Sequence, residues 1–209
     1  MKRSIILLGG GLDSTYLLVG LRRSNIPLVA LFFNYSQKAY RGELKSCKYF
    51  CKKYDAPLIV VKVELNKLAN CTILKGSKIG DAKQNILQGR NAIFISMAVT
   101  YAATIGANTI YTGFHLDDPG TIPYLDCSVG FVKVFNAYVD SYLDKKYKGI
   151  RLCCPFDMST RERIVEIYHP MDEEVITKSF TCYEEGLVEC RKCVHCKKKM
   201  KMKKKLGIK

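Results

Sequence analysis

The chain has 209 residues and a mass of 23.7 kDa, and 48% of the residues are apolar and 25% charged. This length accommodates one medium domain with at most a small appendage, and this composition excludes a disordered or low-complexity polymer. The formal net charge is +15, but residues 191–209 hold ten Lys or Arg and no acid, so the excess lies mainly at one end. The remaining charge suits binding of a nucleotide or another anion better than an extended nucleic-acid surface.

Signals for export or membrane insertion are not evident in the sequence. No apolar run approaches the roughly 20 residues that span a bilayer, and residues 4–8 are too short for a secretory core. We therefore expect a cytoplasmic protein without a membrane partner. In a reducing compartment, the spacing of some of the ten cysteines indicates metal binding rather than disulfides.

Short apolar runs alternate with helical patterns along most of the chain. The first run, residues 3–8, ends at Gly9-Gly10-Gly11 and predicts a buried strand, a tight turn and a helix that stops before Pro27. Further strands are predicted over residues 28–33, 58–63, 109–113 and 150–153, and further helices within 41–54, 91–105 and 129–143. Five apolar strands separated by helices predict an α/β fold, with a parallel five-stranded sheet covered by helices on both faces.

A ligand site is expected at one edge of this sheet. Parallel sheets of this kind bind ligands at the carboxyl ends of their strands. The glycine turn at residues 9–11 and the loops after Phe33 and Gly113 should therefore converge on one site. We assign residues 1–179 to the α/β domain and residues 180–209 to a metal-binding segment with a basic tail.

Four cysteines in this last segment have a spacing typical of a zinc site. They are Cys182, Cys190, Cys193 and Cys196, in the pattern C-x7-C-x2-C-x2-C. Zinc prefers four thiolates in a tetrahedron, and a closed set of four leaves no position for substrate, so a structural Zn²⁺, one per chain, is expected. An iron–sulfur cluster and reduced, buried cysteines are the alternatives. The lysines after Cys196 are interpreted as a solvated helix end that offsets the thiolate charge, with nucleic-acid binding as the alternative.

The glycine turn suits an anion. A strand, three glycines, Asp13-Ser14-Thr15 and a helix would direct backbone N–H groups and a helix N-terminus at a phosphate. The segment lacks the lysine of a Walker A loop and the spacing of a dinucleotide fingerprint.

This segment resembles the S-G-G-x-D-S loop of the ATP pyrophosphatases, through Gly9-Gly10-Gly11-Leu12-Asp13-Ser14. With the cysteine segment, the resemblance narrows to the QueC family of 7-cyano-7-deazaguanine synthases. Further segments are similar to family motifs in the same order: Phe33-Asn34-Tyr35-Ser36-Gln37, Gly89-Arg90-Asn91, Tyr124-Leu125-Asp126-Cys127, Ser159-Thr160-Arg161-Glu162 and Thr181-Cys182-Tyr183. Nearly the whole chain is covered, and an adenine-nucleotide alpha-hydrolase-like fold is implied.

The resemblance implies an ATP-dependent C–N ligase of queuosine precursor biosynthesis. Such an enzyme adenylates the carboxylate of 7-carboxy-7-deazaguanine, lets ammonia displace AMP to give an amide, then adenylates the amide oxygen and eliminates AMP to give the nitrile. ATP acts as co-substrate with Mg²⁺, and the family implies a homodimer.

The resemblance also assigns roles to individual residues. ATP is expected to contact Leu8, Gly9, Gly10, Gly11, Leu12, Asp13, Ser14 and Thr15. Asp13, Ser14 and Arg90 are the expected catalytic residues, with Arg90 as a phosphate clamp and Asp13 as either a Mg²⁺ ligand or a helix cap. The deazaguanine is expected to contact Tyr35, Gln37, Asn91, Asp118, Tyr124, Asp126 and Cys127. His115 follows a predicted strand, where a site residue is possible, although a structural role is favoured.

Several positions depart from the family pattern. Gly9 replaces the leading serine of the loop, Ser36 replaces a glycine, and Ser128 replaces an arginine. Most of these changes lie on the substrate side, so an enzyme that stops at the amide or acylates another amine is an alternative. A zinc-stabilised RNA-binding module is the alternative from another class.

Overall fold

The computed structural model describes residues 3–67, 71, 73–75, 87, 89–115 and 125–208. The strands are β1 Ser4–Leu7, β2 Leu28–Asn34, β3 Leu58–Lys62, β4 Thr109–Tyr111 and β5 Arg151–Cys153. The helices are α1 Leu12–Arg23, α2 Tyr40–Lys53, α3 Arg90–Ile105, α4 Val129–Tyr142, α5 Arg161–Tyr168, α6 Glu174–Lys178 and α7 Val194–Lys205. Short 3-10 helices lie at Leu65–Lys67, Leu125–Cys127, Lys145–Tyr147 and His169–Met171.

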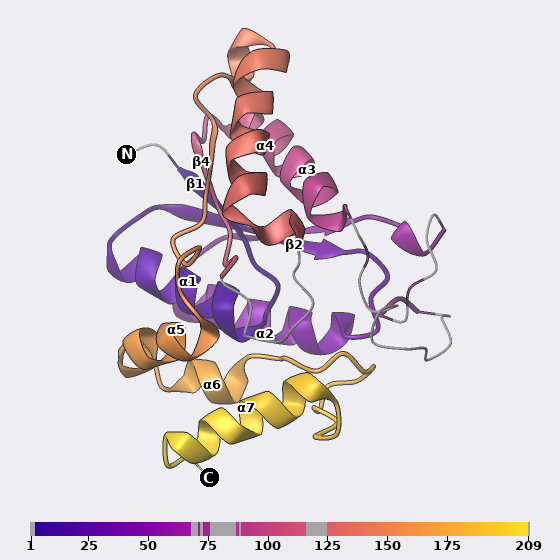
Figure 1. Cartoon of the computed structure of the whole chain (residues 1–209), viewed down its shortest axis with the longest axis vertical. Coiled ribbons are helices and arrows are strands. Elements are labelled where there is room, and N and C mark those ends of the chain that lie inside the picture. The colour runs from indigo at the N-terminus through magenta and orange to yellow at the C-terminus, as the bar shows by residue number, and fades with distance from the viewer. Residues whose placement is uncertain are drawn as a thin grey trace.

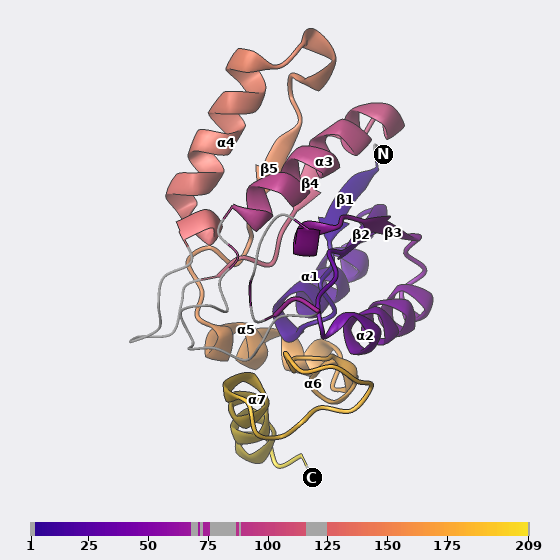
Figure 2. The same cartoon turned by 90° about the vertical axis from the view of Figure 1, so that its right-hand side faces the viewer.

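The five strands form one sheet in the order β3-β2-β1-β4-β5, and all neighbouring strands are parallel (Figures 1 and 2; Figure 2 labels all five strands). Each predicted strand is present, with ends that differ by no more than two residues. The chain proceeds from β1 to β3 in one direction and then returns to place β4 on the other side of β1. The strand order therefore reverses between β1 and β4, and ligands bind at such a reversal in open α/β sheets.

Alternating side chains of the central strands enter two hydrophobic cores. Ile6 and Phe32 pack with residues of α1, α2 and α5, whereas Ile5 and Phe33 pack with residues of α3 and α4. Because successive strand residues point to opposite faces of a sheet, continuous apolar strands require cover on both sides. The predicted two-sided α/β fold is thus confirmed.

The last third of the chain adds two helices that the sequence patterns did not predict, α5 and α6, and a third, α7, where a solvated helix end was expected. Helices α5, α6 and α7 lie below the sheet layers, on the side of α1 and α2 (Figures 1 and 2). Met202 of α7 and the following Leu206 and Ile208 pack against the core of α1 and α2. The lysine-rich end is therefore a packed helix with a solvated face, and the boundary at residue 180 stays a prediction.

Among the described residues, no helix combines the length and apolar character needed to span a bilayer.

Candidate active site

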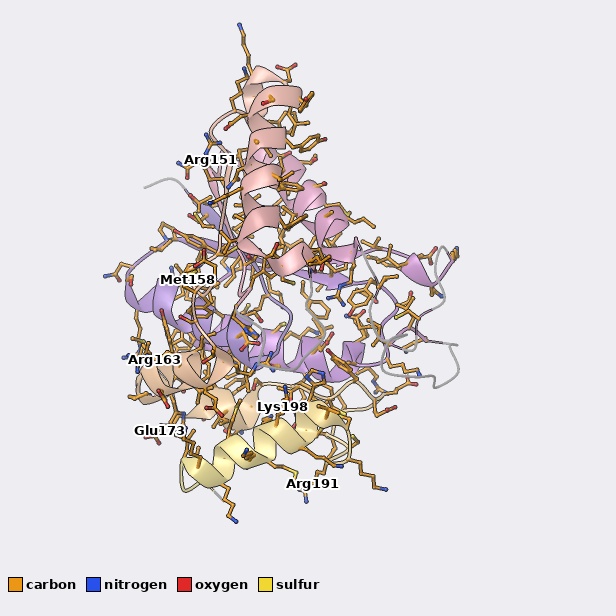
Figure 3. All side chains as sticks on the ribbon, viewed as in Figure 1. Arg151, Met158, Arg163, Glu173, Arg191 and Lys198 are labelled. Carbon is orange, nitrogen blue, oxygen red and sulfur yellow. The ribbon has the colours of Figure 1, made fainter. Side chains whose placement is uncertain are left out.

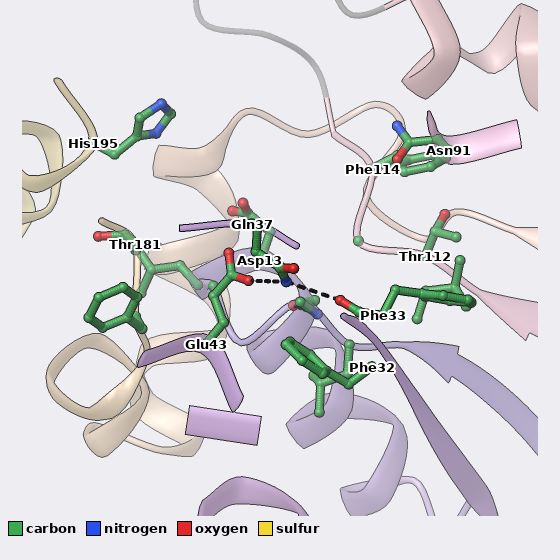
Figure 4. A pocket seen from close by; sticks show the side chains of 18 of the residues that line it. Asp13, Phe32, Phe33, Gln37, Glu43, Asn91, Thr112, Phe114, Thr181 and His195 are labelled. Carbon is green, nitrogen blue, oxygen red and sulfur yellow. Dashed lines mark hydrogen bonds between the residues drawn. The ribbon is translucent and has the colours of Figure 1, made fainter. Parts of the chain in front are cut away.

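A cavity of about 320 Å³ lies at the carboxyl ends of the central strands (Figure 4). Its wall combines the glycine turn after β1, the loop after β2, the start of α3 and the loop after β4. The predicted convergence of these loops is confirmed. Residues of the C-terminal segment complete the wall, which the sequence patterns did not indicate: Phe180, Thr181, Tyr183, His195, Lys198, Lys199 and Met202.

Gly10 allows the glycine turn to approach α2 closely. Its φ is +75°, and a Cβ atom there would lie 2.5 Å from the carbonyl oxygen of Glu43. The Gly10 carbonyl accepts hydrogen bonds from Phe180 N–H at 2.8 Å and from the Ser46 hydroxyl at 2.9 Å. Any side chain at this position would be strained and would collide with backbone, so glycine is required here.

Ser14 and Thr15 differ in their accessibility to a ligand. The Ser14 hydroxyl lies at the cavity wall and accepts a hydrogen bond from Gly9 N–H at 3.2 Å. Thr15 is fully buried and its hydroxyl donates to the Gly11 carbonyl at 2.6 Å. Of the eight residues predicted to contact ATP, Gly10 and Thr15 do not line the cavity, because their polar groups stabilise the turn from behind.

The carboxylate of Asp13 forms an ion pair with Arg161, which lies at the start of α5. Arg161 donates from Nε to Oδ1 at 3.0 Å and from Nη2 to Oδ2 at 2.8 Å. His115 Nε2 lies 3.5 Å from Oδ2. Burial alone would raise the pKa of Asp13, but Arg161 and His115 outweigh it and hold the pKa well below its usual range.

The expected roles of Asp13 and His115 change accordingly. The N-cap of α1 is Gly11 and no side chain caps this helix, so Asp13 does not act as the helix cap, one of the two roles considered for it, and its role as a Mg²⁺ ligand stays a prediction. His115, for which a structural role was favoured, joins the Asp13–Arg161 pair. Gly113 makes this proximity possible, because a Cβ atom there would lie 2.9 Å from the Ser14 nitrogen.

Arg90 begins α3 and its guanidinium lies against aromatic rings. Nη1 donates to the Tyr35 hydroxyl at 3.0 Å, and Cζ lies 5.2 Å from the Tyr35 ring centre and 5.9 Å from that of Phe94. The Nε atom is buried and has no hydrogen-bond partner among the described residues. Arg90 also lines the cavity, so its guanidinium places a positive charge at the cavity wall.

Gln37 is buried and oriented by three hydrogen bonds. Its Oε1 accepts from Tyr35 N–H at 2.9 Å, and its Nε2 donates to the Phe33 carbonyl at 3.0 Å and to Glu43 Oε2 at 2.9 Å (Figure 4). Gln37 therefore binds protein groups with its whole amide. Glu43 faces the cavity and was not among the residues predicted from the sequence.

The other predicted substrate residues lie around the start of α3. Asn91 lines the cavity, donates from Nδ2 to Cys127 Sγ at 3.1 Å, and donates from its backbone N–H to Asp126 Oδ2 at 3.4 Å. Asp126 and Cys127 thus contact a cavity residue without lining the cavity themselves. Asp118 and Tyr124 lie outside the described residues. Ser128 caps α4 by accepting from Phe131 N–H at 3.1 Å.

Helix α7 and the loop before it close one side of the cavity. The rings of Tyr183 and His195 are in contact, with centres 4.1 Å apart and planes inclined by 41°. Lys198 lies on the side of α7 that faces the sheet layers, whereas Arg191 lies on the opposite side (Figure 3). Lys199 is buried and donates to the Ser179 carbonyl at 2.6 Å and to Glu189 Oε2 at 3.0 Å. This ion pair fixes α7 beside the cavity.

The four predicted metal-ligating cysteines meet in one cluster. The sulfur atoms of Cys182, Cys190, Cys193 and Cys196 all lie within 4.8 Å of one another. The edge of a zinc tetrathiolate is about 3.8 Å for a metal–sulfur distance near 2.3 Å, and the Cys190 and Cys196 sulfurs are 3.9 Å apart. Burial opposes ionisation of Cys190, but backbone N–H donors of Cys193 and Lys192 lower its pKa to about 7. The cluster is therefore compatible with a structural metal ion.

Comparisons with known proteins bear on this geometry. A family model described as "Queuosine biosynthesis protein QueC" matches residues 3–207. A 7-cyano-7-deazaguanine synthase of Prochlorococcus marinus (strain MIT 9312) is 30% identical, with coverage of 94% of this chain and 91% of the relative. One of Methanosphaera stadtmanae is 28% identical, with the same coverage.

The solved structure of an NMN synthetase from Francisella tularensis has a TM-score of 0.50 at 12% identity, and the match covers 99% of this chain and 77% of that one. This likeness concerns the fold alone and agrees with the expected adenine-nucleotide alpha-hydrolase-like architecture. The family match confirms the resemblance predicted from the sequence and the expectation of an ATP-dependent enzyme. The chain belongs to the QueC family of queuosine biosynthesis proteins.

Proposed function

We propose that this protein converts 7-carboxy-7-deazaguanine and ammonia to 7-cyano-7-deazaguanine at the expense of ATP. The observation that carries the proposal is the meeting of the glycine turn and Arg90 in one cavity. The Arg90 guanidinium lines the cavity beside the turn, and its fixed positive charge suits a phosphate or carboxylate group. Relatives of this chain are named 7-cyano-7-deazaguanine synthases. In the proposed reaction ATP supplies the phosphates and 7-carboxy-7-deazaguanine supplies the carboxylate.

The cavity offers complementary surfaces for the two reactants. Backbone N–H groups of the glycine turn and the Ser14 hydroxyl would bind the α and β phosphates and stabilise pyrophosphate as it leaves. Phe33 and Phe94 stack with ring centres 4.3 Å apart and form an apolar wall that suits a planar heterocycle. Asn91 also lines the cavity, so the deazaguanine would bind against Asn91, with Asp126 and Cys127 behind that residue.

The reaction then proceeds in two similar halves. A carboxylate oxygen attacks the α-phosphorus of ATP, the bond to pyrophosphate breaks, and an acyl adenylate forms. Ammonia attacks the carbonyl carbon, AMP leaves, and the amide results. The amide oxygen attacks a second ATP in the same way, and loss of AMP and of the nitrogen-bound protons gives the nitrile.

Metal ions enter this proposal at two places. The cysteine cluster fits Zn²⁺, which would tie the segment after Phe180 to the body of the protein and so shape the cavity wall. Both oxygens of Asp13 accept from Arg161, so we propose that this carboxylate positions Arg161 and that Mg²⁺ is held by the phosphates of ATP. A homodimer, as the family resemblance implies, is part of the proposal and is measured by sedimentation.

The test is incubation of purified protein with 7-carboxy-7-deazaguanine, Mg-ATP and ammonium, followed by mass analysis of the base. Nitrile, with AMP and pyrophosphate, is the expected product. Accumulation of the amide would favour the shortened reaction, and no release of AMP in response to the acid would exclude the proposal.

A further inference from the structure

The carboxyl group of Glu43 is a cavity residue that the proposed ATP and deazaguanine contacts leave without a role. It projects into the cavity from the first turn of α2, beside Thr181 and Gln37 (Figure 4). Its main chain is locked in place, because the Gly10 backbone lies directly against the Glu43 carbonyl. The acid therefore occupies a fixed position next to the turn expected to hold the phosphates.

One oxygen of this carboxyl is committed and the other is available. Oε2 accepts from Gln37 Nε2, whose second hydrogen is used by the Phe33 carbonyl. Gln37 cannot reverse its amide without losing the bond from Tyr35 N–H to Oε1. No other hydrogen bond to the Glu43 carboxyl comes from a described residue, so Oε1 can accept from a ligand in the cavity.

The surroundings of Glu43 allow its carboxyl group to accept and release a proton near neutral pH. Burial raises the pKa of Glu43 to about 7, although the Gln37 hydrogen bond and the charge of Arg90 act in the opposite direction. The other titratable groups that face it are Tyr35, next to Arg90, and Cys47, one turn along α2. Burial raises the pKa of both Tyr35 and Cys47, so neither competes as a base.

We propose that Glu43 binds the ammonium ion and removes its proton before the amide forms. This inference rests on the proposed function, which requires ammonia as the nucleophile. A carboxylate repels phosphate and carboxylate groups of the other reactants but matches a small cation with N–H donors on every side. Its place at the wall, against the glycine turn, brings the bound nitrogen to the cavity in which the acyl adenylate would form.

The step balances without a further reactant. Ammonium transfers one proton to the Glu43 carboxylate, which leaves ammonia with a free electron pair. The nitrogen attacks the acyl carbon, the new C–N bond forms, and the bond from that carbon to the AMP oxygen breaks with its electron pair on AMP. The excess proton of the attached nitrogen passes to water, and Glu43 releases its own proton to water before the next cycle.

The experiment compares Glu43→Gln with the wild type and with Glu173→Gln, an exposed acid outside the cavity (Figure 3). Two reactions are measured for each protein. One is exchange of labelled pyrophosphate into ATP with 7-carboxy-7-deazaguanine and without ammonium, which reports adenylation alone. The other is amide formation over a range of ammonium concentrations at pH 7 and at pH 9.

We expect Glu43→Gln to keep the exchange rate within a few-fold while amide formation at low ammonium falls on the order of 10²-fold. Its KM for ammonium should rise. The difference in the rate of amide formation between this variant and the wild type should become smaller at pH 9, where more free ammonia is present. Glu173→Gln should match the wild type in both reactions.

Equal loss of exchange and amide formation, or an unchanged KM for ammonium, would overturn the role of Glu43 and leave the proposed function standing. Absence of exchange in the wild type would overturn both. If Glu43→Gln does not fold, Glu43→Asp keeps the charge on a shorter side chain, and the same two measurements decide with the same expected pattern.

Discussion

Ser14 presents the hydroxyl with which the glycine turn would contact leaving pyrophosphate. Ser14→Ala removes this donor and also frees the Gly9 N–H that Ser14 now accepts from. We expect turnover to fall on the order of 10²-fold, as when one donor to a developing negative charge is deleted. Ser24→Ala, at the other end of the same helix, is the control and should be neutral. Equal kinetics of the two variants would contradict the placement of ATP.

Asp13 should make stability depend on pH through its ion pair with Arg161. The side chains of Arg161 and Asp13 are 20% and 17% exposed, so we expect Asp13→Asn to lower the free energy of unfolding by about 2 kcal/mol at pH 7, below the roughly 3–5 kcal/mol of fully buried pairs. A carboxyl with a lowered folded pKa stabilises the protein above its unfolded pKa, about 3.9, and this contribution is lost as pH falls towards the folded value.

Urea unfolding of wild type and Asp13→Asn at several pH values checks this expectation. The difference between the two proteins should be constant from pH 5 to 7 and should shrink below about pH 4. A difference that persists unchanged at pH 3, or no difference at pH 7, would contradict the assigned pair.

Residue motifs predicted most of the cavity, including Asp13, but missed the acid Glu43 and the cations Arg161, Lys198 and Lys199. Glu43, Arg161 and Lys198 reach the cavity only because α2, α5 and α7 border it, and no local pattern encodes that arrangement. Gly10 and Thr15 show the converse, because a loop motif does not distinguish residues that face the ligand from those that support the turn.

The cysteine segment is the element on which the wall of the cavity depends. Cys193→Ser should remove one thiolate of four, reduce the metal content from about one Zn per chain, and release α7 from Tyr183. Lower thermal stability and weaker ATP binding should therefore accompany metal loss, measured by metal analysis, calorimetry and nucleotide titration. Cys153→Ser, on the edge strand and outside the cluster, is the matched control.

A metal-free Cys193→Ser protein with wild-type stability and activity would show that the cluster has no structural role. An iron–sulfur cluster would instead be recognised by visible absorption and by iron in the analysis.

Secondary structure could be predicted where the spacing of apolar residues agreed with the glycines that precede or end an element. Each strand is a short apolar run, and α1 and α3 follow glycines and carry apolar stripes, so these elements can be predicted from sequence alone. Helices α5 and α6 are short, and α7 is dominated by lysine, so their apolar contacts are too few to stand out in sequence. Their positions depend on tertiary contacts such as that of Phe180 with Gly42, where a Cβ atom would lie 2.4 Å from the ring.

On the scale of the whole molecule, the lysine-rich end tests the RNA-binding alternative. Lys197, Lys201 and Lys204 are exposed on α7, so replacing all three with alanine leaves the packed Met202 and Leu206 in place. We expect this variant to convert 7-carboxy-7-deazaguanine at a rate within a few-fold of the wild-type rate. If the protein acted on RNA, the slope of log K against log salt would flatten by about 0.7 for each phosphate that the variant no longer neutralises. RNA binding with a steep salt dependence that is lost when these lysines are replaced would favour the RNA-binding alternative.

At the scale of the whole molecule, the central requirement of the proposed function is that each substrate molecule consumes two ATP molecules. It is tested most directly with 7-carboxy-7-deazaguanine whose two carboxylate oxygens are ¹⁸O, incubated with unlabelled Mg-ATP and ammonium, and with AMP and the base analysed by mass spectrometry. The proposed function predicts nitrile without oxygen, two AMP per nitrile, and one ¹⁸O in each AMP, because each adenylated oxygen leaves with its phosphate. Unlabelled AMP, or no AMP that depends on the acid, would contradict the claim.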